Sequence, residues 1–475
     1  MTAVKTQAGP RELLAPLLPL LGPWLRTRRW YAAEDTAPGA AAGMLSPVVV
    51  DVVRQEAPAL LHAVLRTGSG RLYQFLLGVR PELPGRLAGA AIGRVGEGSW
   101  RGWTLYEATE DPVLMGVLLH HLVRGTDEGL RLARTTAVPL PVSLTARPLT
   151  ADQSNSAVGY GDRLLLKIYR RPEPGPHLEV ETLRALTEAR CPRTPRLHGT
   201  LLSGAGTLVL GLMEDLLPAD GDGWQAAVRQ VADCVDGTCT TVPATGGFTA
   251  RARALGTAVA EVHTALADTF PRARLTPDDI AREAALMTER LALAAREVPA
   301  LERHRGGLTR LYDAYARAAA RGCPVLAQRV HGDLHLGQAL PTAGGWRLID
   351  FEGEPARPAA ERAALQPVLK DVAGMLRSFD YAAQAGLRLL GERAPDDSPG
   401  GRLRRGRRAR AWAVRNRRAF MAGYADTGGT DPLCHPLPLR ALEADKAVYE
   451  AVYESRHRPD WLPIPLAAVH RLART

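Results

Sequence analysis

Two acidic motifs stand close together in the second half of the chain. HGDLHLGQ occupies residues 331–338, and WRLIDFEGEP occupies residues 346–355. Their carboxylate, amide and imidazole groups suit a phosphotransfer centre, a metal site or a simple polar turn. The spacing narrows the choice, because Asp333 and Gln338 repeat the D-x-x-x-x-N pattern of a catalytic loop, with glutamine in place of asparagine. Both amides present a neutral oxygen to a hard cation, so the exchange is chemically tolerable.

An ordered series of charged residues accompanies these motifs. Phosphoryl transfer from ATP needs a cation on the donor phosphates and an acid that holds this cation. It also needs a carboxylate at the acceptor hydroxyl and oxygen ligands for magnesium. Lys167 lies on an expected strand, Glu181 on the helix after it, and Asp350 at the end of the run WRLID. Each residue alone has an ordinary explanation, such as an exposed lysine or a helix-surface acid. Their joint order favours phosphotransfer over a stand-alone metal site.

Lysine is rare in this chain. Of the 60 basic residues only four are lysines, namely Lys5, Lys167, Lys370 and Lys446. Arginine therefore serves wherever a generic positive charge suffices. A retained lysine is a candidate for a role that needs a compact, flexible ammonium group.

Strand patterns precede helix patterns along the chain. β-branched or alternating runs predict strands at residues 46–53, 59–67 and 71–80, a further strand at 136–144, a hairpin at 157–170 and a buried strand at 207–213. Helices are expected at residues 113–123 and 177–186, and apolar residues at three- and four-residue spacing predict a mainly helical chain from about residue 217. A sheet-rich front half and a helical back half imply a cleft between two lobes. Lys167 then lies on the hairpin, and the acidic motifs lie among the helices.

Composition excludes several classes of protein. A chain of 475 residues should hold two or three domains, and its five scattered cysteines fit reduced thiols in a cytoplasm. The N-terminal LLAPLLPLLGPWL contains three prolines and lacks a small-residue cleavage site, so it predicts a packed helical turn rather than a signal peptide. No apolar run reaches the roughly 20 residues of a membrane helix. The net charge of the chain is +10, and its densest basic run is residues 402–418. The helical spacing of this run, without interleaved stacking aromatics, predicts a solvated helix face. We therefore expect neither a nucleic acid nor a membrane as partner.

Two common nucleotide-binding motifs are absent. No Gly-Lys dipeptide occurs, which excludes a P-loop, and no G-x-G-x-x-G occurs, which argues against a dinucleotide fold and the usual protein-kinase glycine loop.

The two acidic motifs resemble the aminoglycoside-phosphotransferase and kinase-like superfamily, in which HGD replaces HRD and DFE replaces DFG. The chain more closely resembles bacterial maltokinases over nearly its whole length. The resembling segments are RRWYA (28–32), DQSNSAV (152–158), LKIYRR (166–171), DVAGMLRSFDYAA (371–383) and DKAVYEAVYESRHRPDWLPIPL (445–466). In ALQPVLKDVAGM this chain has Gln-Pro where relatives tend to show Ser-Pro-Leu, so the loop before Asp371 departs from the pattern.

The resemblance implies an α+β fold of the bilobal protein-kinase-like type. It divides into an N-terminal cap subdomain (1–98), an intermediate subdomain that completes the nucleotide-binding N-lobe (99–216) and a helical C-lobe (217–475). It also implies ATP-dependent phosphorylation of maltose to maltose 1-phosphate, which feeds α-glucan synthesis. ATP and Mg²⁺ are the implied cofactors, and the resemblance also suggests association with a trehalose-converting enzyme, as is thought for some relatives. By position, Asp333 is the expected base, Gln338 and Asp350 bind the metal, and Lys167 binds the phosphates with Glu181 as its partner. Further expected ATP contacts are Gln153, Ser154, Asn155 and Ser156 in a loop over the phosphates, and Met213, Glu214 and Leu216 in the adenine hinge.

The acceptor site can also be argued from the residues. Tyr449 and Tyr453 lie four apart on one helix face, and Lys446 lies three residues before the first. Aromatic faces surrounded by charges of both signs suit the hydroxyls and ring faces of a neutral sugar. Helix packing is the competing explanation for the two tyrosines. His335, Glu352, Arg377 and Tyr381 are further expected acceptor contacts.

Two alternatives to a maltokinase stay open. One is a kinase of the same fold acting on glucose or glucosamine, and glucosamine would call for an extra carboxylate that faces its amine. The other is a silent sugar- or nucleotide-binding subunit, which is disfavoured because no catalytic acid is missing.

Overall fold

The computed structural model describes residues 9–31, 45–126, 129–149, 155–204, 206–236, 247–322, 324–354, 357–393 and 398–474. Contacts divide the chain into two compact units. The first comprises residues 1–184 and 196–217, and the second comprises residues 185–195 and 218–475.

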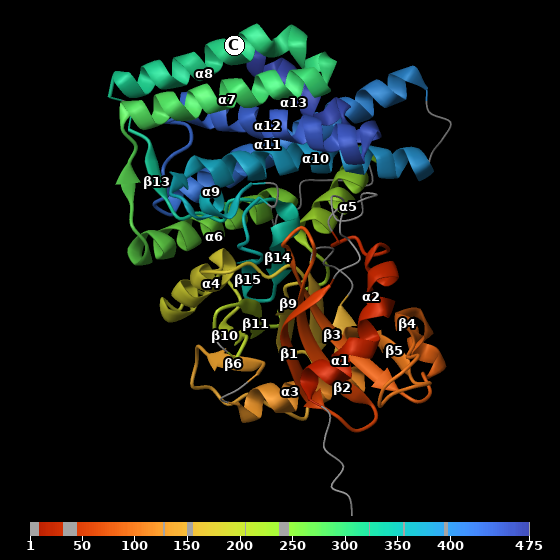
Figure 1. The fold of residues 1–475 in the computed structure, drawn as a ribbon. Helices are drawn as coiled ribbons and strands as arrows, with labels where there is room; N and C mark the ends of the chain where they lie inside the picture. The colour runs from red at the N-terminus through yellow and green to blue at the C-terminus, as the bar shows by residue number, and fades with distance from the viewer. Residues whose placement is uncertain are drawn as a thin grey trace, which may run out of the picture. The chain divides into compact units, whose positions relative to one another are not determined.

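The first unit begins with a five-stranded antiparallel sheet. Its order is β1 (Ser46–Arg54), β2 (Ala59–Arg66), β3 (Leu72–Arg80), β5 (Thr104–Glu107) and β4 (Ala91–Arg94). The expected N-terminal helical turn is confirmed as α1 (Pro10–Leu14) and α2 (Leu18–Leu25), which bury their leucines against the sheet. Three of the predicted strands thus form the β1–β3 meander (Figure 1).

A six-stranded sheet follows in the same unit. Its order is β6 (Arg131–Arg134), β10 (Leu197–Leu202), β11 (Val209–Asp215), β9 (Leu164–Ile168), β8 (Ser156–Tyr160) and β7 (Ala146–Leu149). The predicted hairpin is confirmed as β8 and β9, and helix α3 (Pro112–Arg124) packs its leucines into the same core. The strand expected at residues 136–144 is wrong. This segment is irregular because Pro139 and Pro141 supply no N–H donor for a sheet, and β7 begins only at Ala146.

The second unit is mainly helical (Figure 1). Its helices are α5 (Gly223–Asp236), α6 (Gly247–Thr269), α7 (Pro277–Glu297), α8 (Glu302–Ala320), α9 (Ala359–Ala363), α10 (Leu369–Arg393), α11 (Pro399–Asp426), α12 (Pro436–His457) and α13 (Pro463–Ala473). Antiparallel α7 and α8 pack on each other and on α12. The arginine-rich run lies on α11, as the helical spacing predicted.

Short strands place the acidic motifs among these helices. The first motif follows β13 (Leu326–Gln328), which pairs with β12 (Ala273–Arg274) and β16 (Gln366–Pro367). It leads into the hairpin of β14 (Ala339–Thr342) and β15 (Gly345–Leu348), and Asp350 follows this hairpin. The two motifs therefore meet at one end of a short antiparallel ladder.

The expected α+β class is confirmed, with antiparallel sheets in the first half and helices in the second. A subdomain boundary at residue 98 stays a prediction. Within the described residues, no helix combines the length and the apolar character needed to span a bilayer.

Candidate active site

A buried carboxylate from α10 shapes the HGD turn. Asp371 accepts hydrogen bonds from the backbone N–H groups of His331 (2.7 Å) and Gly332 (2.9 Å), and a ring nitrogen of His263 lies 2.9 Å from it. Burial alone would raise the pKa of Asp371, but His263 and the Gly332 N–H outweigh burial and lower it. The carboxylate thus stays ionised and fixes the backbone that precedes Asp333.

Asp333 itself meets a lysine from α12. Lys446 Nζ donates to Asp333 Oδ1 at 2.9 Å and to Glu354 Oε1 at 2.6 Å. Glu354 is 2% exposed and also lies near Lys370 and Arg357. Burial would raise the pKa of Glu354, yet Lys446, Lys370 and Arg357 together lower it. Burial would likewise lower the pKa of Lys446, but Asp333 and Glu354 raise it. Glu354 and Lys446 are therefore both charged at neutral pH.

Asp333, Lys446 and Tyr449 line one cavity of about 470 Å³. Its walls come from the HGD turn, α7, Glu354, the segment 357–370 and α12, all in the second unit. The volume falls in the range of roughly 300–1,000 Å³ that is typical of small-molecule sites. The structure thus brings three of the expected residues together at one cavity.

The hairpin places the two expected metal ligands side by side. Gln338 Nε2 donates to Asp350 Oδ2 at 2.9 Å, which leaves the amide oxygen of Gln338 for another partner. Asp350 has a φ of +67°, an uncommon conformation for a residue other than glycine. Carboxylate and amide oxygens are hard donors of the kind that Mg²⁺ prefers, so the pair fits such an ion.

In the first unit, Lys167 is buried on β9 with a carboxylate from α4 (Leu178–Glu188). Lys167 Nζ donates to Glu179 Oε1 at 3.1 Å, and the Tyr169 hydroxyl donates to Glu179 Oε2 at 2.7 Å. The expected partner was Glu181, whereas the structure brings Lys167 to Glu179; the role of Glu181 stays a prediction. Both acids lie in the first turn of α4, but residues two apart point to different sides of a helix, and Glu179 faces the sheet.

The other expected ATP contacts lie in this unit. Gln153 and Ser154 fall outside the described residues, Asn155 is buried, and Ser156 Oγ accepts a hydrogen bond from Arg170 Nε at 2.8 Å. Met213 and Glu214 pair with β9, so the Met213 side chain belongs to the core. The Leu216 N–H donates to the Arg163 carbonyl at 2.9 Å. The roles of these residues in nucleotide binding stay predictions.

Two expected acceptor contacts are buried elsewhere. Arg377 is 1% exposed and is held by Glu450 (2.8 Å) and Asp380 (2.9 Å). This paired guanidinium holds α10 to α12, and its role as an acceptor contact stays a prediction. Tyr381 lies under it and stacks on Trp461 at 6.2 Å between ring centroids. Tyr381 is 8% exposed, so it too packs rather than faces the cavity.

The remaining acceptor candidates are not among the residues that line this cavity. Tyr453 is 43% exposed and lies one helical turn beyond Tyr449. His335 caps the turn that follows it, because its Nδ1 accepts the Gly337 N–H at 3.1 Å, and burial lowers its pKa. Glu352 accepts the Arg362 guanidinium through its backbone oxygen. Acceptor binding by these three residues stays a prediction.

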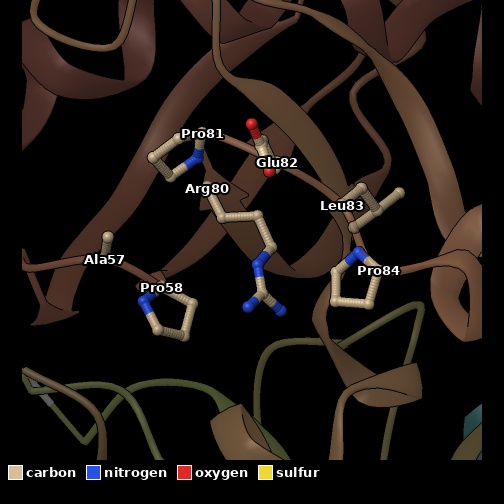
Figure 2. Close-up of a pocket in the computed structure, with 7 residues that line it drawn as sticks. All are labelled: Ala57, Pro58, Arg80, Pro81, Glu82, Leu83 and Pro84. Atoms are coloured by element: carbon tan, nitrogen blue, oxygen red, sulfur yellow. The ribbon is translucent and has the colours of Figure 1, made fainter.

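Another pocket lies in the first unit, beside the β2–β3 end of the sheet. Figure 2 shows the residues that line it, with the Arg80 side chain directed between Pro58 and Pro84. Arg80 pairs with Asp111 at 3.3 Å, and Glu82 is the one carboxylate that lines it. This group of residues lacks a base beside a nucleophile or metal ligands, so it does not compete with the Asp333 cavity.

Sequence reasoning missed three acids: Glu179, Glu354 and Asp371. Glu179 was one of two acids on the same helical turn, and spacing alone did not choose between them. Glu354 stands in FEGEP, where no regular periodicity shows which acid points inward. The rarity of lysine was the usable signal, since Lys167, Lys370 and Lys446 each lie against a buried glutamate.

Comparisons with known proteins identify the family. The model of the maltokinase N-terminal cap domain matches residues 24–111, and that of the phosphotransferase enzyme family matches residues 145–412. A glucosamine kinase of Streptacidiphilus jiangxiensis is 34% identical over 366 residues, which cover 72% of this chain and 79% of the relative. A glucosamine kinase of Mycolicibacterium smegmatis is 32% identical over 336 residues, which cover 69% and 79%.

A solved structure of a glucosamine kinase in complex with glucosamine, ADP and inorganic phosphate is 25% identical. It superposes with a TM-score of 0.65, covering 93% of this chain and 98% of that one. The likeness extends over both units and includes the kinase-like fold. The model of the phosphotransferase enzyme family spans more than half of this chain, and the two glucosamine kinases match at the identities given above. The chain therefore belongs to the phosphotransferase enzyme family.

Proposed function

We propose that this phosphotransferase uses ATP and Mg²⁺ to phosphorylate maltose at its anomeric hydroxyl, giving maltose 1-phosphate. The observation that supports a neutral sugar most directly is the position of Lys446. Its ammonium group occupies the acceptor cavity between Asp333 and Glu354. A cation there repels the ammonium of an amino sugar but can donate hydrogen bonds to hydroxyl oxygens.

In the proposed reaction Asp333 is the general base. Its carboxylate accepts the proton of the anomeric hydroxyl while the oxygen forms a bond to the γ-phosphorus of ATP. The bond between that phosphorus and the β–γ bridging oxygen breaks, and ADP leaves. Lys446 bonds to only one oxygen of Asp333, and Glu354 retains the lysine nearby when the hydroxyl arrives.

The nucleotide side of the proposal concerns the phosphates and the metal. Lys167, held by Glu179, would bind the donor phosphates, and Gln338 with Asp350 would hold Mg²⁺, which offsets phosphate charge when bound. Asn155, Ser156 and the segment Met213 to Leu216 are proposed to contact ATP. Association with a trehalose-converting enzyme stays a prediction.

Glucosamine is the second candidate substrate. The two relatives described above are named glucosamine kinases, and the cavity also contains acids, among them Glu283 and Asp445. Asp445 is already paired with Arg290 at 2.8 Å, however, and Glu354 with Lys446. Two of the cavity acids, Asp445 and Glu354, are therefore already paired with cations, which favours maltose.

A substrate panel tests the proposal. We expect ATP-dependent phosphate transfer to maltose with a kcat/KM at least tenfold above that for glucosamine. Asp333→Asn should lower kcat by about 10²–10⁴-fold, the usual contribution of a general base. Turnover of glucosamine but not maltose would overturn the substrate assignment, and undiminished turnover by Asp333→Asn would overturn the mechanism.

A further inference from the structure

The acceptor cavity continues past Lys446 between two helices. Helix α7 lines it with Glu283, Leu286 and Arg290, and α12 lines it with Leu442, Asp445 and Tyr449. On each helix these residues are three and four apart, so each set forms one face. Seven residues of helix extend about 10 Å. The cavity is therefore elongated along the two helices, with Asp333 in one of its walls.

The two acids on these faces are in different states. Asp445 accepts from Arg290 Nε at 3.0 Å and from Arg290 Nη2 at 2.8 Å, so both of its oxygens are bonded. Glu283 accepts from the Tyr315 hydroxyl at 2.9 Å through Oε2. In the part of the chain that the structure describes, Oε1 of Glu283 has no hydrogen bond and Glu283 has no ion pair.

This difference matters because a carboxylate can accept about four hydrogen bonds, and half-buried Glu283 uses only one of its oxygens. Burial, which the Tyr315 hydrogen bond only partly offsets, raises the pKa of Glu283, and the charge of Asp445 adds to the rise. Tyr315 is fully buried on α8 and fixes the direction of the Glu283 side chain. The result is an oriented acceptor with an unused oxygen on the wall of the sugar cavity.

We infer that Glu283 is a specificity-determining residue, whose Oε1 accepts hydrogen bonds from hydroxyls of the sugar unit beyond the one that is phosphorylated. This inference rests on the proposed maltokinase function. It assigns the inner cavity beside Asp333 and Lys446 to the reducing glucose unit and the α7 wall to the second unit. Glucose, which lacks that second unit, has no group to reach Glu283.

A comparison of two acceptors tests the assignment. Glu283→Gln keeps the size of the side chain but removes its charge and replaces one oxygen acceptor with an NH₂ donor. We expect the KM for maltose to rise about tenfold with kcat within twofold, as for loss of a charge-assisted hydrogen bond. The kinetic constants for glucose should stay unchanged. Glu289→Gln, an exposed change on the same helix, is the matched control and should alter neither sugar.

Tyr315→Phe distinguishes binding from packing, because it removes the hydroxyl that orients Glu283 but leaves both oxygens of Glu283. It should raise the maltose KM less than Glu283→Gln does. An unchanged maltose KM in Glu283→Gln, or equal losses on maltose and glucose, overturns the inference while the proposed function stands. A loss confined to glucosamine overturns it too, because Glu283 would then bind an ammonium. A wild-type enzyme that does not use maltose overturns the proposed function and the inference with it.

Discussion

Two lysine–glutamate pairs with a buried glutamate, one in each unit, have different roles. In the first unit, Glu179 is shared between Lys167 and the hydroxyl of Tyr169. In the second, Glu354 is shared among Lys446, Lys370 and Arg357. Glu179 therefore orients a lysine with the help of a neutral donor, whereas Glu354 balances several positive charges in one place.

Because Glu179 positions a lysine and Glu354 balances charge, their removal should affect different properties. A buried charge needs compensation, so removing the acid that three cations share leaves these cations only partly compensated. Removing Glu179 leaves one lysine less constrained. Variants of Glu354 should accordingly show their largest effect on stability, and variants around Lys167 should show theirs on the use of ATP.

The largest expected effect follows from Glu354→Gln. We expect it to lower the free energy of unfolding at pH 7 by about 3 kcal/mol, because Lys446, Lys370 and Arg357 lose their shared carboxylate. Urea unfolding measures this change. Glu361→Gln, an exposed acid 3.7 Å from Arg357, is the matched control and should change the free energy of unfolding by less than about 0.5 kcal/mol.

The difference in stability between wild type and Glu354→Gln should also depend on pH. The pKa of Glu354 is lowered in the folded state, so its contribution is present above the unfolded pKa of about 4.3 and is lost as pH falls through the folded pKa. The gap in stability between wild type and Glu354→Gln should stay constant from pH 8 to about pH 5 and shrink in stronger acid. A gap that grows on acidification would contradict this account.

The fold was more predictable from sequence than the site, for reasons that particular residues show. Strands β1 to β3 and the β8–β9 hairpin follow from alternating or β-branched runs with turn residues, because burial of one face is a local property of the chain. Residues 136–144 misled the prediction, since their apolar pattern outweighed two prolines that cannot pair in a sheet. Local pattern thus identified the elements but not every exception.

Site contacts depend on side chains that meet across long stretches of sequence. Asp333 and Lys446 are 113 positions apart, and Lys446 and Glu354 are 92 apart. Motif spacing identified Asp333, and the rarity of lysine identified Lys446, but no local signal distinguished Glu354 from Glu352. Arg377 is the opposite case. Its charge is conspicuous in a family motif, but Glu450 pairs with it inside the helical core.

A smaller effect is expected from Lys167→Arg. This change keeps the positive charge but replaces a compact ammonium with a planar fork, which fits poorly beside Glu179 on a buried strand. We expect the kcat/KM for ATP to fall by about tenfold or more, with the maltose KM unchanged. Steady-state kinetics with each substrate varied in turn measures both constants. Equal efficiency of Lys167→Arg and wild type would show that this site needs only charge.

The smallest expected effect discriminates between the two acids of α4. Glu179→Gln removes the charge that holds Lys167 and should raise the KM for ATP by about tenfold, the worth of one charge-assisted hydrogen bond. Glu181→Gln, two positions along the same helical turn, should change that KM by less than twofold. The pair is well matched, because both changes neutralise an acid in the first turn and so weaken the helix dipole interaction equally. A reversed order, with Glu181→Gln the weaker enzyme, would restore the sequence-based assignment and would mean that Glu179 serves the packing of α4 instead of the lysine.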